Sequence, residues 1–139
     1  MKKLFYILPF LLLVNCEDDD NLNNCNFLLD VGVNFTVNLN LPQFNQLQFP
    51  NSPVLIEGIG NYGIYVINTG GNYRAFDAGD PNHIPEACSF MERNGLEVTC
   101  GCADENTYLL ATGTSNNQLP CSLQEYRVTR SGANLVITN

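Results

Sequence analysis

The residues of this chain with the greatest chemical potential are six cysteines and a single histidine. Thiolates and imidazoles are ligands for zinc and for iron–sulfur clusters, and cysteine pairs form disulfides outside the cytosol. Cys100, Cys102, Cys121 and His83 together make an acceptable zinc set of three thiols and one imidazole. The single residue between Cys100 and Cys102 is a tighter spacing than the usual two residues of zinc-binding cysteines. Structural disulfides and a metal site are therefore the alternatives.

No other group of residues indicates enzymatic chemistry. No serine, cysteine or carboxylate pair lies in a recognisable nucleophile or acid–base motif, and a nucleophilic Cys100 would need His83 as its base. Gly58, Gly60 and Gly63 lack the strand-to-helix context of a nucleotide-binding loop. We therefore expect that the chain is not an enzyme.

The first sixteen residues predict the compartment. The basic Lys2 and Lys3 precede an apolar run that is too short to span a bilayer and that ends at Cys16. This layout is typical of a lipoprotein signal, in which residues 1–15 are removed and Cys16 is acylated. Asn15 stands where a small residue is usual, so a plain secretory signal with an unrelated Cys16 is the alternative. Lipid chains on Cys16 would hold the protein on a membrane, because each buried methylene contributes about 0.8 kcal/mol.

An acidic and polar segment, residues 16–30, follows the signal. It cannot bury enough apolar surface to offset its ordering entropy, so we expect a flexible tether. Four acidic residues directly after Cys16 resemble the surface-export signal of Bacteroidetes lipoproteins, and a solvated spacer without a sorting role fits equally well. We expect an outer-membrane lipoprotein of the cell envelope, with surface exposure as one outcome.

The charge of the mature chain excludes one class of partner. Both lysines leave with the signal, so four arginines remain against fourteen acidic residues, a formal charge of −10. Such a chain would be repelled by phosphate backbones, and nucleic acid is not expected as a partner. The sequence does not identify an envelope protein partner.

The elements that must position the cysteines are strands. Residues 33–41 alternate apolar and polar side chains, a period of two that predicts a strand with one buried face. Residues 62–68 and 73–77 flank Thr69-Gly70-Gly71-Asn72 and predict a hairpin. Further strands are predicted at residues 96–99, 107–112, 125–130 and 134–138. The sequence shows no sustained helical periodicity, and the proline-containing residues 41–53 predict an ordered loop over the sheet. We therefore expect residues 31–139 to form one all-β domain.

From about residue 60 onward, the order of motifs resembles a Rieske domain. The hairpin ending in Tyr73-Arg74-Ala75-Phe76-Asp77 is followed by a ligand-type loop, Asp80-Pro81-Asn82-His83, and by Cys88. A second loop, Cys100-Gly101-Cys102-Ala103, precedes an aromatic-led strand at residues 108–113, a proline loop at Leu119-Pro120 and a final hairpin that begins with residues 123–128. Residues 76–83 and the upstream residues 38–42 are more specifically similar to Rieske-like flavobacterial lipoproteins. The resemblance implies a small antiparallel β-sandwich or barrel.

The cluster ligands that the resemblance implies are mostly missing. A Rieske 2Fe-2S centre takes two cysteines on one iron and two histidines on the other. Asp80 stands where the first cysteine is expected, His83 lies one position beyond the Cys-x-His spacing, and Ala103 replaces the second histidine, while Cys100 is kept. We therefore expect no cofactor. A 2Fe-2S cluster with atypical ligands, Cys100, His83 and Asp80, is the alternative, and His83 is otherwise an exposed loop residue.

The resemblance also implies a disulfide between Cys88 and Cys102, which would join the two ligand-type loops. This bridge closes a loop of about 15 residues and would contribute about 3 kcal/mol by restricting the entropy of the unfolded chain. A second bridge between Cys100 and Cys121 is the next expectation, and it would leave Cys25 free near the tether.

Three functions follow from these patterns. The first is a membrane-anchored lipoprotein whose cluster-free Rieske-like domain is a binding or structural module. The alternatives are an electron-transfer protein with an atypically ligated 2Fe-2S cluster, and a thiol–disulfide redox protein that uses Cys100 and Cys102.

Overall fold

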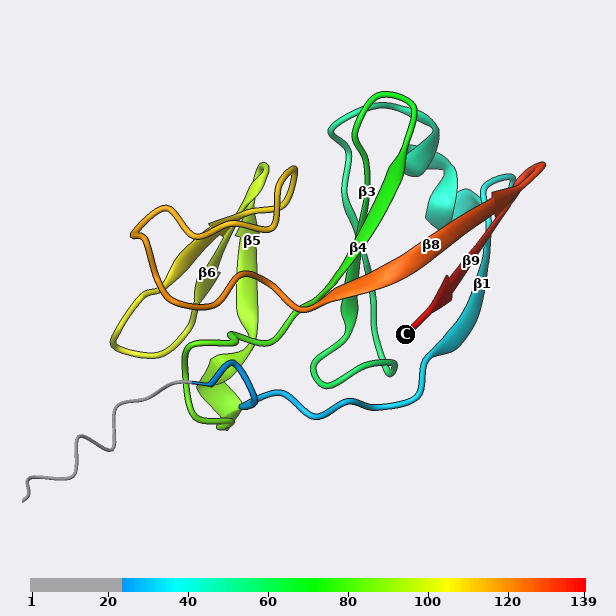
Figure 1. The fold of residues 1–139 in the computed structure, drawn as a ribbon. Helices are drawn as coiled ribbons and strands as arrows, with labels where there is room; N and C mark the ends of the chain where they lie inside the picture. Colours follow the sequence, from blue (N-terminus) through cyan, green and yellow to red (C-terminus); the bar gives the residue numbers. More distant parts are fainter. Residues whose placement is uncertain (1–23) are drawn as a thin grey trace, which may run out of the picture.

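The structure, a computed structural model, describes residues 24–139, which form two antiparallel sheets that lie beside each other (Figure 1). The signal segment and Cys16 lie outside the described residues. The larger sheet has the strand order β1-β9-β8-β4-β3-β2 and the smaller has the order β5-β6-β7. The strands of the larger sheet are β1 (Asn34–Asn38), β2 (Val54–Ile56), β3 (Ile64–Asn68), β4 (Tyr73–Asp77), β8 (Glu125–Ser131) and β9 (Asn134–Thr138). Those of the smaller sheet are β5 (Met91–Asn94), β6 (Glu97–Cys100) and β7 (Thr107–Leu109).

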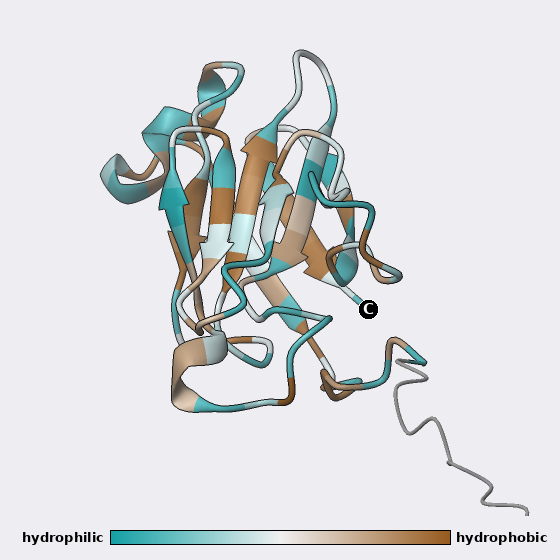
Figure 2. Ribbon diagram, turned by 90° about the vertical axis from the view of Figure 1, so that its left-hand side faces the viewer, coloured by the Kyte–Doolittle hydropathy of each residue, from teal (hydrophilic) through white to brown (hydrophobic). Residues whose placement is uncertain are grey.

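Two apolar clusters fill the domain, one on each face of β3. Ile64 and Val66 point into a cluster enclosed by the curled larger sheet, and Tyr65 and Ile67 point into a second cluster between the two sheets. Successive strand residues point to opposite faces, so a strand buried on both sides needs a continuous apolar run. Figure 2 shows apolar residues along the strands and hydrophilic residues in the connecting loops.

The hairpin predicted around residues 69–72 is confirmed. β3 and β4 pair antiparallel with Asn68 opposite Tyr73. The later strands are also confirmed, although β7 ends at Leu109, three residues before the predicted end.

The predicted strand at residues 33–41 is shorter than expected. β1 ends at Asn38, whose side-chain oxygen accepts a hydrogen bond of 2.9 Å from the backbone N–H of Asn40. An asparagine that bonds the backbone two residues on forms a turn, and this turn ends the alternation. Leu41, which the pattern placed on the buried face, is 42% exposed.

The predicted loop at residues 41–53 contains a short 3-10 helix, η1 (Pro42–Gln48), which packs against β2 and β3 of the larger sheet. Leu47 anchors it in the enclosed cluster. Strands β2 and β5 were not predicted, because three residues are too few to show a period and because β5 buries Met91 alone.

The boundary of the tether at residue 30 is wrong, because residues 24–30 contact the domain. Leu28 is buried, and the backbone N–H and C=O of Leu29 both bond the side-chain amide of Asn61 at 3.0 Å. Asn139 donates to the Asp30 carboxylate at 2.7 Å. No helix within residues 24–139 is long and apolar enough to cross a membrane.

Candidate functional site between the two stapled loops

The two ligand-type loops meet at one end of the smaller sheet. The first loop connects β4 to β5 and includes a short 3-10 helix, η2 (Ala87–Ser89), and the second connects β6 to β7. A disulfide between Cys88 and Cys102 joins them, with 4.9 Å between the two Cα atoms. This is the bridge that the resemblance implied. The two loops are therefore held together covalently, and we call them the stapled loops.

Asp80 is fully buried at the centre of these loops. Its Oδ1 accepts hydrogen bonds from the Tyr108 hydroxyl at 2.5 Å and from the backbone N–H of Asn82 at 2.8 Å. Its Oδ2 accepts a bond of 2.8 Å from the Asn106 amide. A buried carboxylate is tolerated only where donors replace the lost water, and three donors do so here. Both carboxylate oxygens of Asp80 thus already accept hydrogen bonds from protein groups.

Asn82 lies two residues after Asp80, which is the position of the histidine in a Cys-x-His pair. Its Nδ2 donates to the Tyr108 hydroxyl at 2.6 Å and to the Cys121 carbonyl at 2.8 Å, and its Oδ1 accepts from the Cys121 N–H at 3.1 Å. The amide therefore binds both backbone groups of Cys121 and fixes the proline loop against the first ligand-type loop.

Cys121 forms a disulfide with Cys25, so the predicted bridge between Cys100 and Cys121 is wrong. Cys25, which was expected to be free, lies 5.5 Å from Cys121 between Cα atoms. The Asn82 side chain holds Cys121 beside the N-terminal segment, while Cys100 points into the apolar cluster between the sheets. The zinc set of Cys100, Cys102, Cys121 and His83 is also wrong, because two of its thiols are in disulfides.

Cys100 is the one cysteine within residues 24–139 that is not in a disulfide, and it is buried. Burial, which would leave the thiolate poorly solvated, and the neighbouring Asp80 carboxylate together raise the pKa of its thiol to about 12. The thiolate is the reactive and metal-binding form of cysteine. At neutral pH, Cys100 is therefore a buried neutral thiol.

His83 does not join Asp80 and Cys100. Its Nδ1 lies 2.7 Å from the Ile84 carbonyl oxygen and 3.6 Å from Cys102 Sγ. It groups with Cys102 and Asp104, whereas Asp80 and Cys100 group separately with Asp104. The trio that would serve as atypical ligands is therefore not assembled as one site.

The four positions that the resemblance assigns to the ligands of a Rieske centre hold Asp80, Asn82, Cys100 and Ala103, and this set does not fit the cluster. The carboxylate and the amide are bonded to protein groups, the thiol is neutral, and Ala103 has no ligand atom. These hydrogen bonds and the disulfide instead hold the two stapled loops and the proline loop in fixed positions relative to one another. Sequence reasoning missed Asn82 and Tyr108, whose roles depend on contacts between distant segments.

Three solved structures are similar to this chain in overall chain path. One is described as the small subunit of a putative NADH-dependent nitrite reductase from Mycobacterium tuberculosis, at 15% identity and a TM-score of 0.47, covering 79% of this chain and 97% of that one. The second is a complex of reduced oxygenase and oxidized ferredoxin in carbazole 1,9a-dioxygenase, at 13% identity and 0.46, covering 79% and 94%. The third is the ferredoxin of carbazole 1,9a-dioxygenase from Nocardioides aromaticivorans IC177, at 18% identity and 0.44, covering 78% and 97%.

No protein-family model matches the sequence, and no curated protein sequence matches it either.

Proposed function

We propose that this chain is a lipid-anchored envelope protein whose Rieske-like β domain binds no cluster and acts as a binding or structural module. The observation that supports this most directly is the bonding of Asp80. Asp80 occupies an expected ligand position, but its carboxylate already accepts hydrogen bonds from three protein donors. It would have to give up some of these bonds to bind iron.

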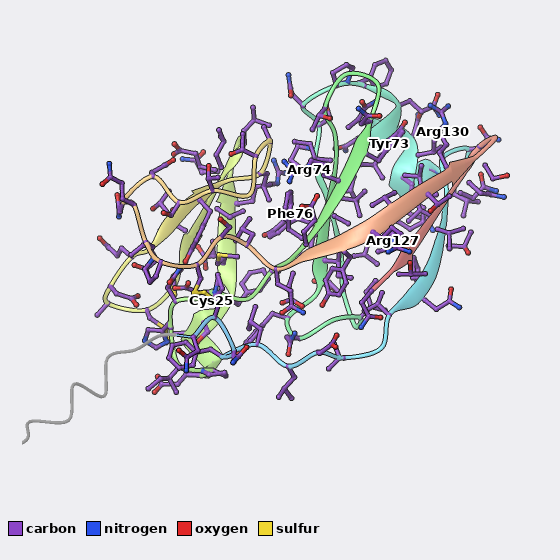
Figure 3. The ribbon with its side chains drawn as sticks, viewed as in Figure 1. Cys25, Tyr73, Arg74, Phe76, Arg127 and Arg130 are labelled. Atoms are coloured by element: carbon purple, nitrogen blue, oxygen red, sulfur yellow. A yellow bond between two sulfur atoms is a disulfide. The ribbon has the colours of Figure 1, made fainter. Side chains whose placement is uncertain are left out.

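The anchor proposal rests on the sequence around Cys16, and the position of the Cys25–Cys121 bridge supports one orientation of the domain. Cys25 follows Cys16 by nine positions, so the lipid would lie within about 30 Å of the bridge even with an extended chain. Cys25 lies at the end of the molecule that carries the stapled loops (Figure 3). The stapled loops would then face the membrane, and the turn between β8 and β9 would face away from it.

The anchor is tested by growing cells with labelled palmitate. We expect the label in the full-length protein and its loss in Cys16→Ser, with the variant released from the membrane fraction. A wild-type protein without label would contradict the lipid anchor and leave the cluster question untouched.

The cluster proposal is tested on the full-length protein in non-ionic detergent, reconstituted with iron and sulfide under reducing and then oxidising conditions. We expect a colourless protein without stoichiometric iron or sulfide. A matched control restores the ligand set in one chain with Asp80→Cys, Asn82→His and Ala103→His, and it should gain visible absorption if the loops are otherwise suited to a cluster. Visible absorption and bound iron in the wild type would overturn the proposal, whatever the control does.

The two alternative functions find less support. An electron-transfer role needs ligands that converge, and His83 groups apart from Asp80 and Cys100. A thiol redox role needs a reactive thiolate, and Cys100 is a buried thiol with a raised pKa whose sequence neighbour Cys102 is bonded to Cys88.

A further inference from the structure

Two polar hollows lie at the end of the larger sheet that is away from the stapled loops, and we call this end the mouth. The larger, about 230 Å³, is lined by Asn40, Gln48, Tyr73 and Arg130 over the buried Leu39, among others. The smaller, about 160 Å³, shares Tyr73 and Arg130 with it. Figure 3 shows Tyr73 and Arg130 at the opposite end of the domain from Cys25.

The strand period explains why these two side chains stand at the mouth. Tyr73 precedes Ala75 on β4 by two residues, and Arg130 follows Tyr126 on β8 by four. Ala75 and Tyr126 lie opposite each other in the enclosed cluster, so Tyr73 and Arg130 continue the same face to the sheet's edge. Polar groups thus begin where the apolar cluster ends.

Arg130 is held in place and retains unused donors. Its guanidinium carbon lies 5.6 Å from the centroid of the Tyr73 ring, and its Nε donates to the Gly132 carbonyl at 3.1 Å. A guanidinium has five N–H donors, so most remain available to a ligand. The ion pairs found within residues 24–139 are Arg74 with Glu125 and His83 with Asp104, so no carboxylate neutralises Arg130.

The charge distribution makes this mouth distinct on an acidic protein. Residues 31–56, 58–76 and 126–139 contain no aspartate or glutamate, whereas residues 80–105 contain six. Arg130 is the one charged residue that lines either hollow, and because surface charges are increasingly screened with distance at ordinary salt, we expect this nearest charge to dominate the potential at the mouth. An anion that the rest of the surface repels would be attracted here.

The other groups at the mouth are suited to hydroxyls. The side chains of Asn40 and Asn72 and the hydroxyl of Tyr73 form no hydrogen bond within residues 24–139, and each can both donate and accept. Recognition sites commonly combine a preformed concavity, such as a barrel mouth, with a few convergent polar groups. Amides and a phenol around one guanidinium match a ligand with many hydroxyls and a carboxylate.

We propose that this mouth binds an acidic saccharide, with the carboxylate of a uronic acid on Arg130 and the neighbouring hydroxyls on Asn40, Asn72 and Tyr73. The proposal deepens the binding role proposed above and depends on it. A mouth turned away from the lipid anchor would be presented to polymers outside the membrane.

The test is calorimetric titration of the full-length protein in detergent with short oligogalacturonates and with the same oligomers after reduction of their carboxyl groups. We expect binding of the acidic oligomers and little binding of the reduced ones. Arg130→Gln should weaken binding by about tenfold or more, because it removes a charge-assisted hydrogen bond. Tyr73→Phe should weaken it less.

Arg127→Gln is the matched control. Arg127 is exposed on the same strand, three residues earlier, so it carries the same charge and points to the opposite face. Binding should be unchanged in this variant. Equal losses in the two arginine variants, equal binding of reduced oligomers, or no binding of the acidic ones would overturn the proposal. The absence of a cluster would be unaffected by these results, so a failure here is distinguishable from a failure of the cluster proposal.

Discussion

The two disulfides should contribute unequally to stability, and their loop lengths give the difference. Cys88 and Cys102 are 14 residues apart, and Cys25 and Cys121 are 96 residues apart. A cross-link restricts the unfolded chain more when it closes a longer loop. The perturbation is the replacement of each pair by serines, Cys88→Ser with Cys102→Ser in one protein and Cys25→Ser with Cys121→Ser in another.

The loss of chain entropy on loop closure gives about 3 kcal/mol for the shorter loop and about 4.7 kcal/mol for the longer one. The difference of about 1.7 kcal/mol depends only on the ratio of the loop lengths, because the length-independent part of the closure entropy cancels. Both double variants lose the same strand and helix contacts when they unfold, so these contacts do not contribute to the difference. The pair that anchors the N-terminal segment should therefore be the more stabilising one.

The assay is urea unfolding followed by circular dichroism, since the chain contains tyrosines but no tryptophan. The free energy of unfolding of each double variant is compared with that of the wild type and with Cys100→Ala, which removes no bridge. Equal losses, or a larger loss for the Cys88–Cys102 pair, would refute the loop-length reasoning. Such a result would mean that the N-terminal segment detaches without unfolding the sheets.

Three further predictions concern single positions. The raised pKa of the Cys100 thiol means that the folded state favours the protonated thiol, so the free energy of unfolding should fall as the pH rises from about 9 through about 12. The fall should be at most about 1.4 kcal/mol per pH unit. In Cys100→Ala the urea midpoint should therefore fall less steeply between about pH 9 and about pH 10. Tyr108→Phe deprives the buried Asp80 carboxylate of a donor and should cost about 1–3 kcal/mol in urea unfolding, whereas an unchanged midpoint would contradict the role of this bond. Gly113→Ala should lower the melting temperature, because Gly113 has a φ of +76° and an added Cβ would lie 2.6 Å from the Phe76 ring. An unchanged melting temperature would show that the ring can move aside.

The strands could be predicted wherever the sequence carries a period or a turn signal. The hairpin at Thr69-Gly70-Gly71-Asn72 is an example, because its glycines adopt the positive φ values that the turn needs. The same reasoning extended the first strand to Leu41, because the alternation continues past Asn38. A local side-chain bond of Asn38 ended the strand, and such a bond leaves no trace in the apolar pattern.

The cysteine pairing shows where sequence reasoning stopped. The bridge between Cys88 and Cys102 followed from a resemblance that fixes the order of two loops. The partner of Cys121 depends on the amide of Asn82, which binds the backbone of Cys121 across 39 residues, and no spacing encodes that contact. For the same reason the sequence placed His83 with Asp80 and Cys100, while the fold turned it toward Cys102.

The contacts around Asp80 are made by protein groups, and they would hold these loops in position without a metal. Cluster ligands would tie the two loops together through iron, and in this chain the Cys88–Cys102 bridge makes that connection covalently. Asp80 then binds the second loop through Asn106, and Asn82 binds the proline loop through Cys121. Because these links between the three loops are made by protein groups, bound iron would add no connection and would have to displace existing hydrogen bonds. The stability of the domain should therefore not depend on iron, and a chelator should leave its urea midpoint unchanged while a disulfide reductant lowers it.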